Sequence, residues 1–511
     1  MTIFFAKKKH PEVLLHMAVS FGPNSGGRTK AVFERSAYLA REWQEQLIIT
    51  LNHRMEYRTI FEDWATRHTL PKSVKMRNMF EDIAGEELYL PRGVSVRYQL
   101  PNGAESTDRQ LCWRTTNGHK ESHYTLRKNG SLAHIKTYEN GNLVQLDRFD
   151  RSSTLRTRET RMNDTVLGID YFLSDGFRFA AVDGILSAPD TQIIVDRGLF
   201  STGGSAISVI ELQKRWMAYL CETLHQPIAM IDDRGADPLF IDNPHLKTDV
   251  ATIAILHSNH LRAPYTDVTA INSFNGPAIE HAERFSAISF LTEHQLADAR
   301  QVYPCANGWV IPNAVQNPRR TPLRRTPGQR FVLVTRLVSL KRLDHGIRAF
   351  AQVVAQFPRA KLEIWGTGDH IAELKALVAD LNLEKSVKFK GFTTNPSLAY
   401  QGAAGSLIVS KYEGFPFALQ EALVHGVPVV AYDFRYGPRA MLRDGWNGYI
   451  VENGDIDALA DRIIKILGHP VRSRIMGLRA RMIMLTLSKR RIARKWSALI
   501  QSVNGQRAAR G

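Results

Sequence analysis

The sequence predicts an α/β protein with two parallel-sheet domains, the first of which is interrupted by an inserted antiparallel sheet. Three observations favour this fold class. Strand and helix patterns alternate toward both ends of the chain, Asn-Gly pairs recur between residues 102 and 141, and a Pro- and Arg-rich segment separates two α/β regions. A chain of 511 residues also exceeds what one hydrophobic core supports, so more than one domain is expected.

The first 85 residues read as the opening of a parallel sheet. EVLLHMAVS at 12–20 predicts a buried strand, and a helical pattern then runs from Ala31 to about Trp43. QLIITLN at 46–52 predicts the next strand. This strand, loop, helix, strand order is typical of a right-handed parallel unit. We therefore assign residues 1–85 to the first part of an N-terminal Rossmann-like domain.

Residues 86–205 have the pattern of an inserted β-meander. Short alternating runs are separated by Asn-Gly pairs, which favour two-residue hairpin turns and begin at Asn102, Asn117, Asn129 and Asn140. The edges of such a sheet must be blunted or paired with another subunit, so an oligomerisation role is expected. Arginines crowd its later part and could hold a polymer with repeated phosphates: Arg148, Arg151, Arg156, Arg158 and Arg161.

The α/β pattern resumes in the second half of the chain. Residues 206–318 form the second part of the N-terminal domain, 314–330 are rich in Pro and Arg and read as a linker, 319–490 form a C-terminal Rossmann-like domain, and 491–511 are a basic tail. One or two basic helices are expected between about Arg472 and Ile500. The expected strands are 227–232, 251–258, 287–292, 308–315, 331–337, 362–366, 387–392, 406–410 and 428–433.

Charge and cysteine content indicate which partners and which cellular compartment suit the protein. A formal charge of +17 attracts polyanions such as nucleic acid, anionic lipid or an anionic polymer. Its basic residues gather at Lys7 to Lys9, at 319–330 and from Arg472 to Lys495. Three widely separated cysteines suggest neither a disulfide framework nor a zinc site. No run is apolar enough to span a membrane, and the start lacks a secretory pattern. We expect a cytoplasmic protein, with peripheral attachment to the inner face of the membrane left open.

Two carboxylates bracket a turn within residues 405–438. Glu413 lies on the loop after a predicted strand, and Glu421 lies in the first turns of the following helix, where open parallel sheets place their ligand crevices. A helix start attracts phosphate, so a nearby pair of acids is better suited to neutral hydroxyls beside the phosphate. Sugar nucleotides contain both parts.

The segment EGFPFALQE at 413–421 resembles the donor-binding motif of retaining glycosyltransferases with two facing Rossmann-like domains, the GT-B fold. Four further segments resemble that family and lie in its order: 336–350, 364–369, 426–433 and 444–451. The inserted meander resembles the branch that contains wall teichoic acid α-glycosyltransferases and the related enzymes that glycosylate serine-rich adhesins. In that branch the meander is an oligomerisation module, so a homo-oligomer, suspected to be a trimer, is expected.

The resemblance implies roles for residues of the C-terminal domain. Arg336 and Lys341 match the pair that binds the donor diphosphate, and cations there stabilise the charge of the leaving group. Glu421 matches the residue that accepts bonds from the ribose, and Glu413 the one that holds hydroxyls of the transferred sugar. Backbone N–H groups expected to face the sugar and phosphate belong to Gly414, Phe415 and Phe417.

The N-terminal domain contributes weaker candidates. Gly26 and Gly27 would let the backbone approach a phosphate or the acceptor closely. His257, at a predicted strand end, matches a family histidine that touches the donor sugar. Three polar residues at strand ends are acceptor-side candidates: Asp232, Arg234 and Asn259.

The leading hypothesis is transfer of glucose or N-acetylglucosamine from a UDP-sugar to poly(glycerol phosphate) or poly(ribitol phosphate) teichoic acid, with retention. The resemblance implies no metal and no cofactor. The leaving phosphate can take the acceptor proton, so no general base is named. One alternative is O-glycosylation of serine-rich adhesins together with a noncatalytic partner subunit. The other is a nucleic-acid or polyanion-binding protein on an inactive transferase scaffold. The residues do not decide between the two sugars or the two polyols.

Overall fold

The computed structural model describes residues 10–23, 26–88, 97–107, 111–162, 165–186, 191–196, 198, 200–315 and 328–509. The chain divides into two compact units, Met1–Thr252 and Ile253–Gly511, and each is described by itself. The basic cluster Lys7 to Lys9 and most of the predicted linker 314–330 lie outside the described residues.

The first unit contains four parallel strands in the order β14-β1-β2-β3. Their bounds are β1 Leu14–Val19, β2 Gln46–Thr50, β3 Val74–Asn78 and β14 Ile228–Ile231. Four helices accompany them: α1 Gly27–Leu39, α2 Tyr57–His68, α3 Met79–Ala84 and α4 Val209–Glu222. The helix expected from Ala31 begins at Gly27, because extended Gly26 acts as its N-cap and the Gly-Gly pair conceals the start.

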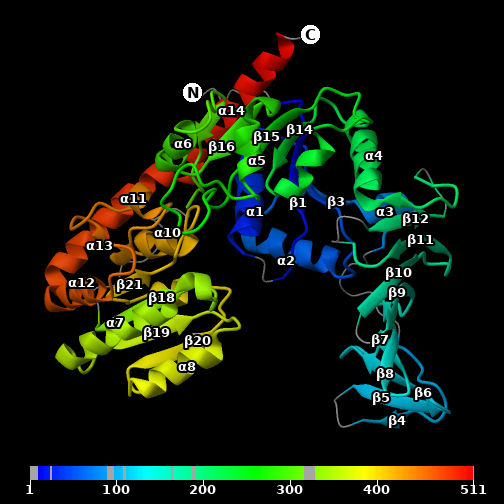
Figure 1. The fold of residues 1–511 in the computed structure, drawn as a ribbon, viewed down its shortest axis with the longest axis horizontal. Coiled ribbons are helices and arrows are strands. Elements are labelled where there is room, and N and C mark those ends of the chain that lie inside the picture. Colours follow the sequence, from blue (N-terminus) through cyan, green and yellow to red (C-terminus); the bar gives the residue numbers. More distant parts are fainter. Residues whose placement is uncertain are drawn as a thin grey trace, which may run out of the picture. The chain divides into compact units, whose positions relative to one another are not determined.

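The predicted meander is an antiparallel sheet of ten strands that follow one another from β4 to β13, and Figure 1 shows most of this succession. The strands are β4 Glu105–Ser106, β5 Cys112–Asn117, β6 Lys120–Leu126, β7 Leu132–Glu139, β8 Asn142–Phe149, β9 Leu155–Met162, β10 Thr165–Phe172, β11 Arg178–Asp183, β12 Gln192–Val195 and β13 Ile207–Ser208. Asn140 and Gly141 both have positive φ and join β7 to β8, as expected for an Asn-Gly hairpin.

Most of the meander arginines form ion pairs with acidic residues of the same sheet. Arg158 contacts Asp147 at 2.9 Å, and Arg148 and Arg161 both pair with Glu159. Arg156 is 4% exposed and contacts Asp150 at 2.8 Å. Four of the five arginines expected to hold an anionic polymer therefore stabilise the sheet itself, which weakens that expectation.

The second unit begins with three parallel strands, β15 Ala251–Ile255, β16 Ala287–Phe290 and β17 Gly308–Val310. Two helices belong to this part, α5 Gly276–Glu280 and α6 Glu293–Arg300. The helix α6 was not predicted, since EHQLADAR has few apolar residues. The structure shows its start clearly, because the Thr292 hydroxyl accepts a hydrogen bond from Gln295 N.

The rest of the second unit is built on a six-stranded parallel sheet in the order β20-β19-β18-β21-β22-β23. The strands are β18 Arg330–Val334, β19 Lys361–Trp365, β20 Val387–Gly391, β21 Gly405–Ile408, β22 Val429–Tyr432 and β23 Gly448–Val451. The helices are α7 Leu343–Gln356, α8 Ile371–Asp380, α9 Ser397–Tyr400, α10 Phe417–Val424, α11 Pro438–Met441, α12 Ile456–Gly468, α13 Pro470–Met484 and α14 Lys489–Ala508.

The outcome agrees with the predicted doubly wound pattern, except that β23 was not expected. The two basic helices predicted near the end of the chain are α13 and α14. No helix within the described part of the chain is both long and apolar enough to cross a membrane.

Candidate active site

Lys341 and Glu413 meet at one edge of the six-stranded sheet. Strands β18 and β21 are parallel neighbours, so the loops that follow them emerge side by side. The loop after β18 ends in a short 3-10 turn at Lys341, and its Leu340 O accepts a hydrogen bond from Lys411 N at 2.9 Å. The Lys341 ammonium forms an ion pair with the Glu413 carboxylate, and the Ser410 hydroxyl donates to the same oxygen at 2.9 Å. The acid and cation predicted for the donor site are thus direct neighbours.

Arg336 stands two residues beyond β18, on a backbone held by the loop after β19. Leu337 N donates to Thr367 O at 3.0 Å, and Thr335 N donates to Trp365 O at 2.9 Å. A Cβ on Gly366 would lie 1.8 Å from Thr335 O, and one on Gly368 would lie 2.2 Å from Leu337 O. Only glycine permits this approach. The Arg336 side chain is exposed and has no ion-pair partner among the described residues, so it can accept an anionic ligand.

The Glu413 loop packs directly on the backbone that carries His257. A Cβ on Gly414 would lie 2.2 Å from His257 O and 2.9 Å from Ser258 Cα, so the two chain segments touch where glycine stands. His257 lies two residues beyond β15 and is partly exposed. The structure therefore brings the predicted sugar-contacting histidine beside the predicted sugar-binding glutamate.

A third segment, residues 435–437, holds the Glu413 loop and the His257 segment together. Glu413 N donates to Arg435 O at 3.3 Å and Tyr436 N donates to Glu413 O at 2.7 Å, so the backbone of Glu413 is held on both sides. Asn259 is 2% exposed and its Nδ2 donates to Arg435 O at 2.9 Å. Asn259 was expected on the acceptor side, and its amide instead ties the His257 segment to residue 435.

Asp298 anchors the same segment from α6. Its Oδ2 accepts a hydrogen bond from the Tyr436 hydroxyl at 2.8 Å and lies 3.3 Å from Arg435 Nε. The His260 ring stacks on Tyr436 with centroids 5.6 Å apart, and neither of its ring nitrogens has a hydrogen-bond partner among the described residues. Burial lowers the pKa of His260 to about 4, while Asp298 opposes the shift. This histidine is therefore neutral near pH 7.

The remaining motif residues lie on α10. The helix begins at Phe417 without a side-chain cap, and Glu421 is its fifth residue. Glu421 is partly buried near Tyr400, because its charge adds to the burial that raises the pKa of that phenol. Phe415 and Pro416 are buried, and a Cβ on Gly437 would lie 2.4 Å from Pro416 Cδ. The GFPF turn is therefore fixed by packing.

In the first unit, Gly26 and Gly27 start α1. The φ angle of Gly26 is −79°, and no atom lies within 4 Å of a Cβ placed there, so neither strain nor packing requires glycine. Asp232 is 3% exposed and contacts Arg35 at 2.5 Å. Arg234 is 7% exposed and contacts Asp237 at 3.3 Å. Both acceptor-side candidates are thus engaged in buried ion pairs.

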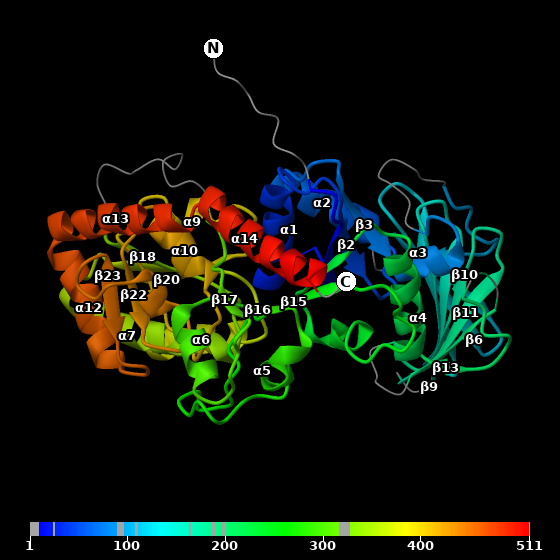
Figure 2. The ribbon, with the colours of Figure 1, turned by 90° about the horizontal axis from the view of Figure 1, so that it is seen from above.

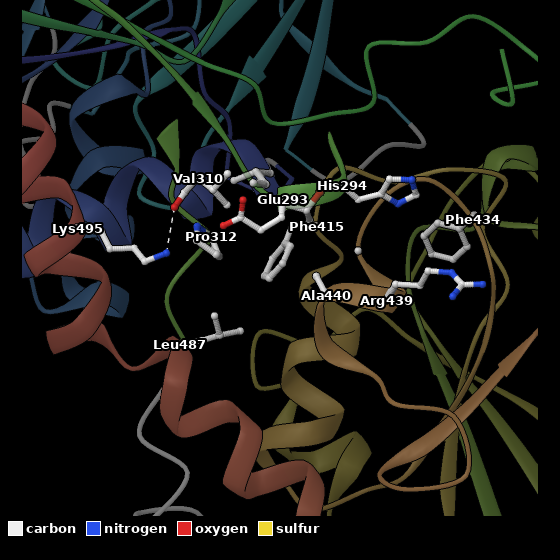
Figure 3. A pocket seen from close by; sticks show the side chains of 13 residues that line it. Glu293, His294, Val310, Pro312, Phe415, Phe434, Arg439, Ala440, Leu487 and Lys495 are labelled. Atoms are coloured by element: carbon white, nitrogen blue, oxygen red, sulfur yellow. Dashed lines mark hydrogen bonds between the residues drawn. The ribbon is translucent and has the colours of Figure 1, made fainter. Parts of the chain in front are cut away.

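A pocket of about 350 Å³ lies next to the Glu413 loop, and Figure 3 shows its side chains. Phe415 is the predicted site residue that lines it, and Lys495 of α14 donates a hydrogen bond to Val310 O at 3.1 Å on its wall. The start of α6 contributes Glu293 and His294. Neither Glu413 nor Lys341 lines this pocket, so we do not assign it to the donor.

Metal ligands are not gathered anywhere in the described part of the chain, where no group of three or more His, Cys, Asp or Glu side chains could hold an ion. The chain contains one Asp-x-Asp, a pattern that can hold a metal ion, at Asp455 and Asp457. Asp455 caps α12 by accepting from Ala458 N at 2.8 Å, and Asp457 accepts from Gln352 at 2.7 Å. Both carboxylates have structural partners.

Several residues that support the site were not named from the sequence. Gly366 and Gly368 lie in the segment 364–369 that was matched to the family, and their signal is a Gly-x-Gly directly after a strand, but neither glycine was given a role. Asp298, Arg435 and Tyr436 had no such signal, because their contacts join segments more than 100 residues apart.

Comparison with known proteins agrees with this description. Residues 316–483 match the family model of glycosyl transferases group 1. The poly(glycerol-phosphate) alpha-glucosyltransferase of Bacillus subtilis (strain 168) is 30% identical over 263 residues, which cover 50% of this chain and 38% of that protein. The poly(ribitol-phosphate) alpha-N-acetylglucosaminyltransferase of Staphylococcus aureus (strain COL) is 24% identical over 497 residues, 94% of this chain and 97% of that protein.

Solved structures give the same fold. The crystal structure of TarM matches 96% of this chain and 98% of its own with a TM-score of 0.76 at 21% identity. The pneumococcal O-GlcNAc transferase GtfA, in complex with UDP and GlcNAc, matches 97% and 99% with a TM-score of 0.78 at 16% identity. The predicted fold class is confirmed: a GT-B transferase fold with a separate antiparallel sheet.

Proposed function

We propose that this chain, whose residues 316–483 match the model of the glycosyl transferases group 1 family, is a retaining glycosyltransferase that moves glucose or N-acetylglucosamine from a UDP-sugar to a poly(glycerol phosphate) or poly(ribitol phosphate) chain. The observation that carries the proposal is the meeting of Lys341 and Glu413, with Arg336 on the same loop as Lys341. One cation-rich loop and one acid-bearing loop at a sheet edge suit a diphosphate joined to a sugar.

The donor diphosphate is assigned to Arg336 and Lys341. Charge on the leaving phosphate grows as the sugar–phosphate bond breaks, so cations fixed there favour the transition state over the ground state. Lys341 pairs with Glu413, and donor binding would let the ammonium turn toward phosphate oxygens while Glu413 accepts sugar hydroxyls. Two cations can neutralise the diphosphate, so we propose that no metal ion or cofactor is required.

Retention is proposed to follow from attack on the face that the diphosphate leaves. The acceptor hydroxyl oxygen forms the new bond to the sugar carbon, the bond to the phosphate oxygen breaks with its electron pair, and the leaving phosphate takes the hydroxyl proton. Glu413 then positions the sugar and forms no covalent bond. The open space at Gly26, where no atom lies within 4 Å of an added Cβ, supports a close approach of a ligand to the start of α1.

A polyol-phosphate acceptor is supported by charge and by relatives. A formal +17 raises the local concentration of a polymer with one negative charge per repeat. A peptide-modifying GtfA subunit of Streptococcus gordonii is 25% identical over 268 residues, so O-glycosylation of serine-rich adhesins with a noncatalytic partner is the second candidate. A pure polyanion-binding role is less favoured, since it would not need Glu413 beside Lys341.

We also propose a homo-oligomer, a trimer, joined through the meander. Three exposed apolar side chains gather at one end of the strands β9, β10 and β11: Met162, Leu167 and Ile185. Thr165 is paired with Met162, and Gly184 N donates to Leu167 O at 3.0 Å, so these side chains share one rim. Burial of such a rim against other copies is favourable. Cytoplasmic location, with peripheral attachment to the inner face of the membrane, fits this assignment.

The test is a screen of purified chain with UDP-glucose and UDP-N-acetylglucosamine, each with poly(glycerol phosphate), poly(ribitol phosphate) and a serine-rich peptide. Sugar incorporation into one polyol polymer, with retained anomeric configuration by NMR, supports the proposal. Incorporation into the peptide, and only in the presence of a copurifying partner, would favour the second candidate. Absence of both transfer and donor hydrolysis would refute the enzyme assignment.

A further inference from the structure

The helix α13 carries an apolar stripe on its outer face. Four of the thirteen large exposed apolar side chains of the described residues lie on it: Val471, Ile475, Leu478 and Met482, which are 75%, 44%, 42% and 64% exposed. Their spacings of four, three and four residues place them within roughly 60° of the helix circumference. A continuous exposed apolar stripe of this kind marks an interaction surface.

The stripe is not an incomplete part of the protein core, because the opposite face of α13 already fills that role. Ser473, Met476 and Ala480 are buried on the inner side. A Cβ on Gly477 would lie 2.0 Å from Gly426 O, so the helix is pressed against the end of α10 with no room to rotate. Both views show α13 on the outside of its unit, with β21 further inside in Figure 1 and β22 and β23 further inside in Figure 2.

Arginines flank the stripe on both sides. Arg472 and Arg479 lie on one flank, and Arg474 and Arg481 on the other, each roughly 60–90° from the centre of the stripe. Arg472 and Arg474 are exposed and have no ion-pair partner among the described residues. Arg479 stacks over Trp446 with its guanidinium 5.3 Å from the ring centroid. An apolar centre between cationic flanks is the pattern of a helix that lies in the interface of an anionic bilayer.

We propose that α13 docks on the surface of a membrane that contains anionic lipid, with the stripe among the acyl chains and the arginines at the headgroups. A partner protein would need acidic residues placed opposite both arginine flanks. A surface of anionic lipid presents negative charge to both flanks at once, without a specific partner. The segment QNPRRTPLRRTP at 316–327 is a poor cover for the stripe, since it holds one large apolar residue and four arginines. The inference does not depend on the proposed transferase reaction.

The experiment is cosedimentation of the full chain with vesicles of phosphatidylcholine alone and of phosphatidylcholine mixed with phosphatidylglycerol. The wild type should bind the mixed vesicles and release them at high salt. Leu478→Glu should weaken binding roughly ten-fold or more, because one leucine no longer enters the acyl region. The double variant Arg472→Gln/Arg474→Gln should lose roughly five-fold per charge. Leu111→Glu is the matched control, since Leu111 is 38% exposed elsewhere in the chain.

Circular dichroism of each variant separates loss of binding from loss of fold. Equal binding by the wild type and Leu478→Glu, or no binding of mixed vesicles by the wild type, would overturn the proposal. Light scattering without vesicles tests the other occupant, a second copy of the chain. A smaller assembly for Leu478→Glu than for Leu111→Glu would assign the stripe to self-association and reject the membrane surface.

Discussion

The Lys341 ammonium and the Glu413 carboxylate, 72 residues apart in the sequence, form an ion pair at the edge of the six-stranded sheet. Their side chains are only 12% and 20% exposed, so the pair is shielded from bulk water. Each residue is assigned to a different part of the donor, the diphosphate and the sugar. The ion pair holds both side chains in place. Under the proposed assignment it must open for either residue to bind donor, so substitutions of the two residues should have different effects.

Lys341→Ala and Glu413→Gln should have different effects on UDP. Lys341→Ala removes a cation from the diphosphate site, so UDP affinity and turnover should both fall. Glu413→Gln frees Lys341 from its competing anion, so UDP affinity should stay the same or rise. Its turnover should fall by roughly 10²–10³, if loss of one positioned bond at a transition state is a guide. Calorimetry with UDP and transfer kinetics measure the two quantities.

The control for this pair is Lys375→Ala, which removes an exposed lysine of α8. It should leave UDP affinity and turnover unchanged. If Glu413→Gln weakened UDP binding as much as Lys341→Ala does, the two residues would not have separate roles.

Gly414→Ala should impair both folding and activity. The new methyl group would lie 2.2 Å from His257 O, and the contact is with backbone, which cannot rotate away. Overpacking of this kind costs about 1–3 kcal/mol and would displace Glu413 from His257. Thermal denaturation and donor hydrolysis provide the measurements.

Gly26→Ala is the matched glycine variant. Because its φ is −79° and its surroundings are open, the expected cost is that of alanine at an N-cap, about 1 kcal/mol, so the melting temperature should fall less than in Gly414→Ala. If donor hydrolysis nevertheless declines, the methyl group obstructs a ligand. A Gly414→Ala protein with wild-type stability and activity would show that the observed contact is not required.

The extent to which the sequence predicted the site follows from how local each feature is. Glu413, Glu421, Arg336 and Lys341 lie in short segments whose order along the chain is readable, and the structure brings Glu413 and Lys341 together. The Asn140-Gly141 hairpin was likewise predictable, because turn chemistry is decided by two adjacent residues. Asn129-Gly130 instead lies in a longer loop between β6 and β7. The helix α6 was missed since its buried face is short and its cap, Thr292, is a common residue.

Contacts between distant segments could not be predicted. Asn259 was placed on the acceptor side by its position after a strand, but its amide bonds to the backbone of Arg435, 176 residues away. The meander arginines looked like a phosphate-binding patch, and their acidic partners on adjacent strands became evident only with the strand register. Periodicity indicates which face a side chain occupies and not which residue stands opposite.

Tyr436→Phe should lower turnover through Glu413 without altering the residues that we assign to the donor. The substitution removes the hydroxyl that donates to the buried Asp298 at 2.8 Å, which leaves this carboxylate with its longer contacts to Arg435 at 3.3 Å and His294 at 3.6 Å. The expected loss of stability is about 1–3 kcal/mol. Because Tyr436 N holds Glu413 O, kcat should fall more than the donor KM rises.

Tyr303→Phe is the control for this prediction. Its hydroxyl donates to Glu280 at 3.1 Å on the exposed surface, so the same chemical change there should alter neither stability nor kcat. A Tyr436→Phe enzyme with unchanged kcat would mean that Asp298 stabilises the fold without positioning Glu413. Asp298→Asn, which keeps an acceptor for the hydroxyl, should fall between the wild type and Tyr436→Phe.

His260→Phe should make the protein less sensitive to acid. The folded-state pKa of His260 is lowered to about 4 by burial, whereas in the unfolded chain it is near its ordinary value of 6.5. Between these two pH values the unfolded state binds a proton that the folded state does not bind. The contribution of His260 to the free energy of unfolding is therefore fully present above pH 6.5 and is lost as the pH falls toward 4. The slope is about 1.4 kcal/mol per pH unit, so roughly 2 kcal/mol is lost by about pH 5. Phenylalanine keeps the stacking on Tyr436 and removes two buried nitrogens without partners. Urea denaturation at about pH 7.5 and about pH 5 should therefore show a smaller drop in midpoint for His260→Phe than for the wild type.

His16 and His53, whose pKa values burial lowers to about 3, keep the remaining acid sensitivity. His281→Phe, at a side chain that is 58% exposed, should reproduce the wild-type drop. Equal drops for all three proteins would mean that His260 is protonated in the folded state, contrary to its buried position.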